Sequence, residues 1–279
     1  MSSILITPAE LSEALAGDAP VRILDVRWRL DRPDGRPEYL EGHVPGAVYV
    51  DLDHTLAEHG EPEDGRHPLP SPELFQAAVR AWGINDGDTV VVYDDLKNQA
   101  SARAWWLLRY AGLADVRLLD GSFRGWVNAG LPVETGDVVP AAGSATLDYG
   151  QLPLIGIDDA AGWSEHGVLL DARAPERYLG EVEPIDPRAG HIPGAVNAPS
   201  IGNVASDGTF LSPEVLRERF AALGVVDGVA VATYCGSGVT AANNAVALTL
   251  AGFEPVLYAG SWSQWSNHAD RPVATGAGS

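Results

Sequence analysis

The chain has 279 residues, of which 46% are hydrophobic and 20% charged, as in a soluble globular protein of one large or two ordinary domains. Its formal net charge of −20 argues against nucleic acid or an anionic membrane surface as a partner. The single cysteine excludes an internal disulfide and a metal site built from several cysteines.

Short apolar runs alternate with helical stretches along the chain, which predicts parallel sheets covered by helices. The expected strands are residues 21–26, 89–93, 116–119, 168–171, 229–234 and 255–258. The expected helices are residues 8–15, 72–82, 101–111, 213–223 and 240–251. The chain has no run of about 18 apolar residues, and its start does not have the pattern of a signal peptide. We therefore expect no membrane span and a cytoplasmic location.

The same series of segments occurs twice. LDVR at 24–27 returns as LDAR at 170–173, and GHVPGAV at 42–48 returns as GHIPGAV at 190–196. DGSFRGW at 120–126 likewise matches AGSWSQW at 259–265. This order indicates a duplicated domain rather than a short-period repeat. We expect domains at 1–138 and 151–279, joined by a linker at 139–150 that is rich in Gly, Ala, Val and Pro.

Cys235 directly follows the apolar strand expected at residues 229–234 and comes shortly before the helix expected at residues 240–251. A strand's carboxyl end is where open α/β sheets bind ligands. The loop that follows it is Gly236-Ser237-Gly238-Val239-Thr240. We expect its amide groups to turn inward and, with the helix N-terminus, to form a positive cradle for a thiolate or a persulfide anion. We interpret Cys235 as a nucleophile rather than a buried structural thiol.

Phosphatases and arsenate reductases also hold a cysteine in an anion-binding loop. They need an arginine about six residues after the cysteine to bind the oxyanion through two hydrogen bonds. Ala241 and Ala242 stand there in this chain. The cysteine-dependent phosphatase or arsenate reductase is therefore a disfavoured alternative.

Taken together, the motifs resemble the rhodanese family in its tandem two-domain form. They are the two Asp-x-Arg pairs, the two Gly-His-x-Pro-Gly-Ala segments, the cysteine loop and the closing Gly-Ser-Trp-x-x-Trp at 260–265. The resemblance implies an α/β fold of two rhodanese-like domains, each a mainly parallel sheet with helices on both faces. It also implies a catalytic second domain and an inactive first one, where Asp94 stands at the position of Cys235.

The activity implied by the resemblance is transfer of sulfane sulfur through a Cys235 persulfide. The donor would be 3-mercaptopyruvate or thiosulfate, and the acceptor a thiol, cyanide or a small dithiol protein, without a metal or organic cofactor. The uncharged Gly236 and Ser237 resemble the mercaptopyruvate type, in which Arg177 would bind the substrate carboxylate. A second family arginine is replaced by Ile185, and Arg188 is a candidate substitute.

The family further suggests a relay of Ser237, His67 and Asp53 that would polarise the substrate carbonyl. Asp171 and Arg173 are expected to give structural support. The other alternative is a silent sulfur-binding or regulatory protein that kept the fold and lost the chemistry, as the first domain has; the intact cysteine loop argues against it.

Overall fold

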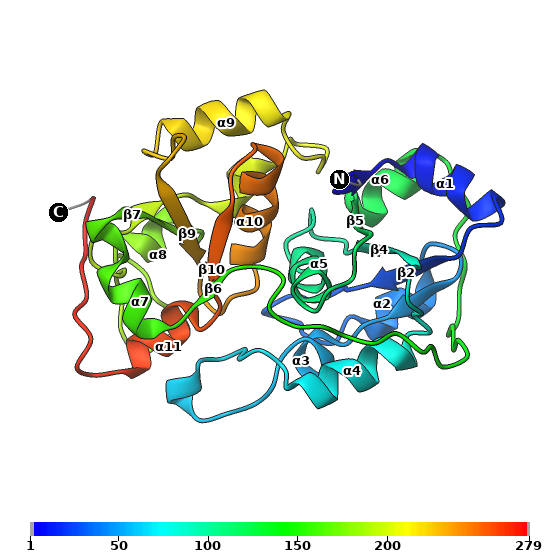
Figure 1. Ribbon diagram of the computed structural model, residues 1–279, viewed down its shortest axis with the longest axis horizontal. Helices are drawn as coiled ribbons and strands as arrows, with labels where there is room; N and C mark the ends of the chain where they lie inside the picture. Colours follow the sequence, from blue (N-terminus) through cyan, green and yellow to red (C-terminus); the bar gives the residue numbers. More distant parts are fainter. Residues whose placement is uncertain (1–2, 278–279) are drawn as a thin grey trace. The chain divides into compact units, whose positions relative to one another are not determined.

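Figure 1 shows the computed structural model of the chain, in which residues 3–277 are described. The contacts divide the chain into two compact units. The first unit comprises residues up to Glu58, Pro70–Leu152 and Val204–Phe210. The second unit comprises His59–Leu69, Pro153–Asn203 and the residues from Leu211 onward. The division follows the sequence repeat except that residues 59–69 and 204–210 each pack with the unit formed mainly by the other repeat.

The first unit contains a five-stranded parallel sheet with the strand order β1-β5-β4-β2-β3. Its strands are β1 (Leu5–Ile6), β2 (Val21–Asp25), β3 (Ala47–Tyr49), β4 (Thr89–Tyr93) and β5 (Val116–Leu119). Its helices are α1 (Pro8–Ala16), α2 (Arg36–Glu41), α3 (Leu52–Thr55), α4 (Pro72–Ala81), α5 (Ser101–Tyr110) and α6 (Ser122–Asn128). The central strand β4 ends directly before Asp94.

The second unit repeats this arrangement with the strand order β6-β10-β9-β7-β8, again parallel throughout. Its strands are β6 (Leu154–Ile155), β7 (Gly167–Asp171), β8 (Val196–Asn197), β9 (Ala230–Tyr234) and β10 (Pro255–Tyr258). Its α-helices are α7 (Ile157–Gly162), α8 (Pro175–Tyr178), α9 (Pro213–Ala221), α10 (Ala241–Leu250) and α11 (Ser261–Asn267). In its described part this unit also has the short 3-10 helices η1 (Pro62–Asp64), η2 (Trp163–Glu165) and η3 (Ser200–Asn203).

Helices cover both faces of the second unit's sheet, as Figure 1 shows. Alternate strand residues point to opposite faces. Ala232 and Tyr234 of β9 pack in one core with Trp262 and Trp265 of α11 and with residues of α7 and α8. Helix α10 packs against β9, β10 and α9. Burial on both faces explains why β9 reads as a continuous apolar run rather than an alternating one.

All of the strands and helices expected from the sequence are present, with ends that differ by one or two residues. The elements that the sequence did not indicate are short. They include the edge strands β1, β3, β6 and β8, whose two or three residues are too few to show a period. Within residues 3–277, none of the helices combines the length and the apolar character needed to cross a bilayer.

Candidate active site

Cys235 lies at the carboxyl end of β9, the central strand of the second sheet. The residue is buried, with 2% of its surface exposed. The backbone N–H of Gly238 donates to its Sγ over 3.1 Å. Gly238 has a φ of +77°, which glycine adopts at little cost and which turns the loop back over the sulfur. The amide dipole thus places positive partial charge against Sγ.

The backbone around the cysteine is fixed by the start of α11. The N–H of Cys235 donates to Oγ of Ser261 at 3.1 Å. The carbonyls of Cys235 and Gly236 accept from the N–H groups of Trp262 at 2.9 Å and Ser263 at 2.8 Å. These bonds connect the cysteine loop, residues 235–240, to the Gly-Ser-Trp segment that the sequence repeats.

Asp171 and Arg173 form a buried ion pair behind this loop. Nη2 of Arg173 lies 2.6 Å from Oδ2 of Asp171 and also donates to the carbonyl of Gly190 at 2.7 Å. The guanidinium stacks over the ring of Trp262, 4.7 Å from its centroid. Asp171 is fully buried and Arg173 is 4% exposed. The pair therefore ties the end of β7 to α11 and to the Gly-His-Ile-Pro-Gly turn, and neither residue presents a free charge to a ligand.

His67 and Ser237 lie together in the second unit, because residues 59–69 pack there. Nδ1 of His67 is 2.7 Å from Oγ of Ser237, and both residues are 6% exposed. Asp53 belongs to the first unit, where its Oδ1 accepts a hydrogen bond from Nε1 of Trp28 at 2.9 Å. Two members of the expected relay are thus in contact, and the place of Asp53 in it stays a prediction.

Arg177 and Arg66 both reach the cysteine loop. A Cβ atom placed on Gly236 would lie 3.3 Å from Nη1 of Arg177 and 3.4 Å from Nη2 of Arg66. Two acids of the loop that follows α8 anchor these arginines. Asp186 binds both of them, and Glu183 accepts from Arg177 at 2.7 Å. Arg66 is not among the site residues expected from the sequence. One indication of its role was present in the sequence: Arg66 directly precedes His67, in the first repeat, whereas the cysteine loop is in the second.

Arg188 does not turn toward the cysteine loop. Its guanidinium donates at 2.6–2.9 Å to four backbone carbonyls, those of Trp265, Ser266, His268 and Arg271. These bonds close the end of α11 and occupy all three guanidinium nitrogens.

A cavity of about 320 Å³ adjoins Arg66 in the second unit. Residues 59–62, the loop around Asp186 and helix α11 form its walls, with Ile185 and Ser263 among the lining residues. Ser263 also donates its N–H to Gly236, so the cavity lies next to the cysteine loop. This volume falls in the range of small-molecule sites.

Asp94 stands in the first unit where Cys235 stands in the second. It is fully buried after the central strand β4. Its carboxylate accepts hydrogen bonds of 2.8–3.0 Å from four backbone N–H groups of the loop that follows, those of Leu96, Asn98, Ala100 and Ser101. The same strand–loop–helix element therefore binds an internal anion in the first unit.

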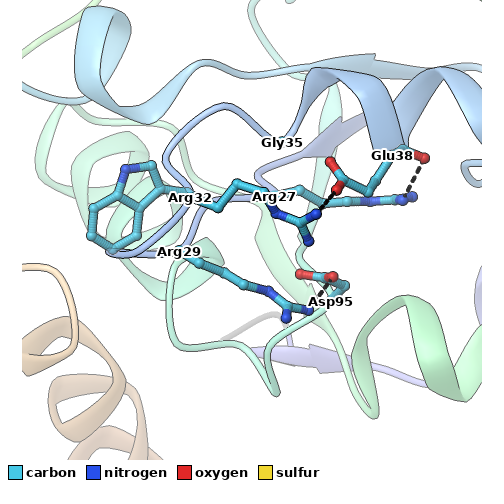
Figure 2. A pocket seen from close by; sticks show the side chains of 7 residues that line it. Arg27, Arg29, Arg32, Gly35, Glu38 and Asp95 are labelled. Carbon is cyan, nitrogen blue, oxygen red and sulfur yellow. Dashed lines mark hydrogen bonds and ion pairs between the residues drawn. The ribbon is translucent and has the colours of Figure 1, made fainter.

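Figure 2 shows a pocket beside the Asp94 loop, of only about 10 Å³. Arg29 binds Asp95 at 2.6 Å, and Arg32 forms an ion pair with Glu38. Asp95 occupies the position that Gly236 has in the second unit. Asp95 thus neutralises Arg29 in the first unit, where the pocket has space for about one water molecule, whereas Gly236 carries no side chain that could pair with an arginine.

Both repeats match one known protein family. The family described as rhodanese-like domain matches residues 7–129 and 157–268. Three of the most similar proteins match nearly their whole length. A Mycobacterium tuberculosis protein named thiosulfate sulfurtransferase SseB is 50% identical over 98% of this chain and 97% of its own. A Pseudomonas aeruginosa protein named 3-mercaptopyruvate sulfurtransferase is 45% identical over 99% of this chain and 100% of its own. The 3-mercaptopyruvate sulfurtransferase of Escherichia coli is 35% identical over 92% of each chain.

Solved structures show the same fold. The crystal structure of the 3-mercaptopyruvate sulfurtransferase SseA from Escherichia coli superposes with a TM-score of 0.83 at 33% identity, over 94% of this chain and 99% of that one. The 3-mercaptopyruvate sulfurtransferase of Leishmania major superposes with a TM-score of 0.84 at 29% identity, over 97% of this chain and 76% of that one.

Proposed function

Because the chain belongs to the rhodanese family and is a sulfurtransferase, we propose that it carries sulfur as a persulfide on Cys235, with 3-mercaptopyruvate as the preferred donor. The acceptors would be a thiol, cyanide or a small dithiol protein. The observation that supports this most directly is the hydrogen bond from the Gly238 N–H to Sγ of Cys235. It gives a buried sulfur anion a donor that is in place before any substrate arrives.

The Asp94 loop of the first unit supports the proposed persulfide, because Asp94 stands where Cys235 stands in the second unit. The carboxylate oxygens of Asp94 lie as many bonds from Cα as the outer sulfur of a cysteine persulfide would. In the first unit, four backbone N–H groups surround these oxygens. The loop after Cys235 lies between the same two kinds of element and reaches its helix one residue sooner, at Ala241, six residues after Cys235, whereas Ser101 is seven residues after Asp94. We therefore infer that its amides receive the outer sulfur of the persulfide.

The proposed reaction has two steps. In the first, the Cys235 thiolate attacks the sulfur of 3-mercaptopyruvate, an S–S bond forms, the C–S bond breaks, and the enolate that leaves takes a proton to become pyruvate. In the second, the acceptor attacks the outer sulfur and Cys235 leaves as a thiolate. Ser237, with its Oγ held by His67, would donate a hydrogen bond to the developing enolate oxygen.

The donor preference rests on the space above Gly236. Nη1 of Arg177 lies 3.3 Å from the place where a Cβ of residue 236 would be, so a substrate carboxylate bound there would meet a guanidinium. Thiosulfate has no carboxylate or carbonyl. The name of the relative that is 50% identical nevertheless makes thiosulfate the donor to be tested beside mercaptopyruvate.

Intact mass spectrometry tests the proposal directly. We expect the protein to gain one sulfur atom when incubated with 3-mercaptopyruvate, to release an equal amount of pyruvate, and to lose the added sulfur to cyanide as thiocyanate. The matched variant is Cys235→Ser, which removes the only thiol of the chain and changes little else. A protein that gains no sulfur from mercaptopyruvate or thiosulfate, or a Cys235→Ser variant that still gains it, would contradict the proposal.

A further inference from the structure

Three buried asparagines meet at the start of α10, the helix that follows the cysteine loop. Asn243 and Asn244 lie in the first turn of α10, and Asn203 is the last residue of η3. All three residues are fully buried. Nδ2 of Asn203 donates to Oδ1 of Asn244 at 2.6 Å and to Oδ1 of Asn243 at 3.1 Å. This group, which we call the asparagine cluster, therefore joins α10 to the short helix η3.

Arg219 of α9 fixes the orientation of the Asn203 amide. Its Nε donates to Oδ1 of Asn203 at 3.2 Å, and its Nη2 donates to the carbonyl of Pro199 at 2.8 Å. A guanidinium can only donate, so Oδ1 of Asn203 must face Arg219 and Nδ2 must face α10. At the other end, Nδ2 of Asn244 donates to the carbonyl of Ala198 at 2.9 Å, which turns Oδ1 of Asn244 toward Asn203. The hydrogen bonds of the cluster thus run in one direction, from Arg219 to α10.

The positive charge of Arg219 has no acid beside it. Within residues 3–277 its hydrogen-bond partners are neutral carbonyl oxygens, and burial lowers the pKa of the guanidinium. The group lies against η3, where a Cβ atom on Gly202 would stand 2.8 Å from Cζ of Arg219. A charge that no counter-ion neutralises polarises the amide that accepts from it, and this strengthens the next hydrogen bond in the series. Arg219 therefore strengthens the bonds that Asn203 donates to α10.

The start of α10 is where amides of the cysteine loop and of the helix come together. In the first unit, the N–H groups of Ala100 and Ser101, at the start of α5, donate to the Asp94 carboxylate at 2.8 and 3.0 Å. The start of α10 has the same place after the cysteine loop. The N–H of Asn243 donates to the carbonyl of Thr240, the last residue of that loop, at 3.1 Å. A displacement of the first turn of α10 would therefore also move the amides of the cysteine loop.

The first unit holds the equivalent helix by different chemistry. Arg103 has the place in α5 that Asn243 has in α10, two residues after the helix begins. Its Nε and Nη2 donate to the carbonyl of Leu56, directly after α3, at 3.2 and 3.0 Å. Helices α3 and η3 both follow the third strand of their unit. Both units thus tie the first turn of this helix to the same region, and the unit that contains the cysteine does so with neutral amides.

Building on the proposed function, we propose that Asn203 is a positioning residue for sulfur transfer. Its amide holds the first turn of α10 where the amides of the cysteine loop can meet the outer sulfur of a Cys235 persulfide. The backbone of Asn203 is fixed as well, because its carbonyl accepts from the N–H of Leu211 at 2.9 Å. A buried network whose hydrogen bonds run in one direction holds a single arrangement, so the amides are in place before the sulfur arrives.

The variant Asn203→Asp separates positioning from stability. The new carboxylate still accepts from Arg219 and gives it a counter-ion, but it places an oxygen against Oδ1 of Asn244, where an N–H donor stood. We expect the Tm to stay close to that of the wild type. The rate constants for sulfur loading from 3-mercaptopyruvate and for sulfur release to cyanide should both fall about 10-fold, because the same amides bind the outer sulfur in both steps. Rapid-quench measurements of pyruvate and thiocyanate give the two constants.

Three further variants complete the test. Arg219→Met removes the charge but leaves the bonds from Asn203 to α10, so it should lower the Tm and change both rate constants less than about twofold. Asn128→Asp adds the same negative charge at the exposed end of α6 and should keep wild-type rates. If Asn203→Asp does not fold, Asn244→Leu, which removes the acceptor and keeps the bond between Arg219 and Asn203, should lower both constants in the same way.

The outcomes separate this inference from the proposed function. Wild-type rate constants in a folded Asn203→Asp or Asn244→Leu variant would overturn the inference. A loss confined to the loading step would place the effect on donor binding and would also overturn it. So would an equal loss in folded Arg219→Met, because the stability of the region alone would then explain the rates. In each case the wild-type protein would still gain sulfur on Cys235; a wild type that gains none refutes the proposed function instead.

Discussion

Nδ1 of His67 lies 2.7 Å from Oγ of Ser237, although the two residues are 170 positions apart in the chain. The contact joins residues 59–69 to the cysteine loop and orients a hydroxyl group beside Cys235. A hydroxyl oriented in this way can donate to a carbonyl oxygen that becomes an enolate.

We predict that Ser237→Ala and His67→Ala each lower kcat with 3-mercaptopyruvate about 100-fold, because the developing enolate loses an oriented hydrogen-bond donor. Sulfur transfer from thiosulfate, which has no carbonyl, should fall less than about threefold. His67→Asn is the conservative control, since its amide can replace Nδ1. Single-turnover release of pyruvate or sulfite measures the first step. Equal losses with the two donors would show that the pair acts on Cys235 and not on the carbonyl.

A side chain at position 236 should fill the space above the cysteine loop. We expect Gly236→Ala to raise KM for 3-mercaptopyruvate about 3- to 10-fold, because its Cβ would stand 3.3 Å from Nη1 of Arg177 and 3.4 Å from Nη2 of Arg66. The free energy of unfolding should change little, since the contacts are with the ends of flexible side chains. Gly156→Ala, where a Cβ would meet nothing within 4 Å, is the control. An unchanged KM would mean that the substrate carboxylate binds elsewhere.

Asp94 is expected to stabilise the first unit rather than to take part in catalysis. Asp94→Ala removes the acceptor of the Leu96, Ala100 and Ser101 N–H groups, whereas the Asn98 N–H keeps Oγ of Ser122, and should lower the free energy of unfolding by about 3–5 kcal/mol. Urea unfolding followed by tryptophan fluorescence measures this change. The folded fraction should load sulfur on Cys235 to the wild-type extent. A variant with wild-type stability would contradict the role of this carboxylate as an internal anion.

Asp25 makes the free energy of unfolding of the first unit depend on pH. Burial raises its pKa from 3.8 to about 6, against the attraction of Arg27, which lowers it. A carboxyl group that binds its proton more tightly in the folded state stabilises the fold at low pH, and this contribution is lost as the pH rises through about 6. Between about pH 5 and pH 7 the loss amounts to about 1 kcal/mol.

Urea unfolding of the wild type and of Asp25→Asn at several pH values between about 5 and 7 measures this contribution. We expect the variant to show a flatter pH dependence than the wild type, because an amide binds and releases no proton in this range. Parallel curves for the two proteins would show that Asp25 is ionised throughout this range. Working above pH 5 keeps the protein away from its isoelectric point of about 4.5.

The duplicated α/β fold could be predicted from the sequence because its central strands are buried on both faces. Strands such as 89–93 and 229–234 must then be apolar throughout, and the helices between them have enough residues to show their own pattern. The edge strands could not be predicted, since pairs such as Leu5–Ile6 are extended only because β5 lies beside them. The position of Cys235 directly after an apolar strand could likewise be predicted from the sequence, whereas the central place of that strand in the sheet could not.

The sequence by itself determined that Cys235 begins a glycine-containing loop between a buried strand and a helix, and that Asp94 takes its place in the other repeat. Only the tertiary structure decided which charges surround that loop. Arg66 reaches Gly236 because residues 59–69 pack with the second unit, and Arg188 is removed from it by four backbone carbonyls. The reason is physical: a strand and its turn are encoded by neighbouring residues, whereas the partner of a long charged side chain depends on which distant backbone lies within its reach.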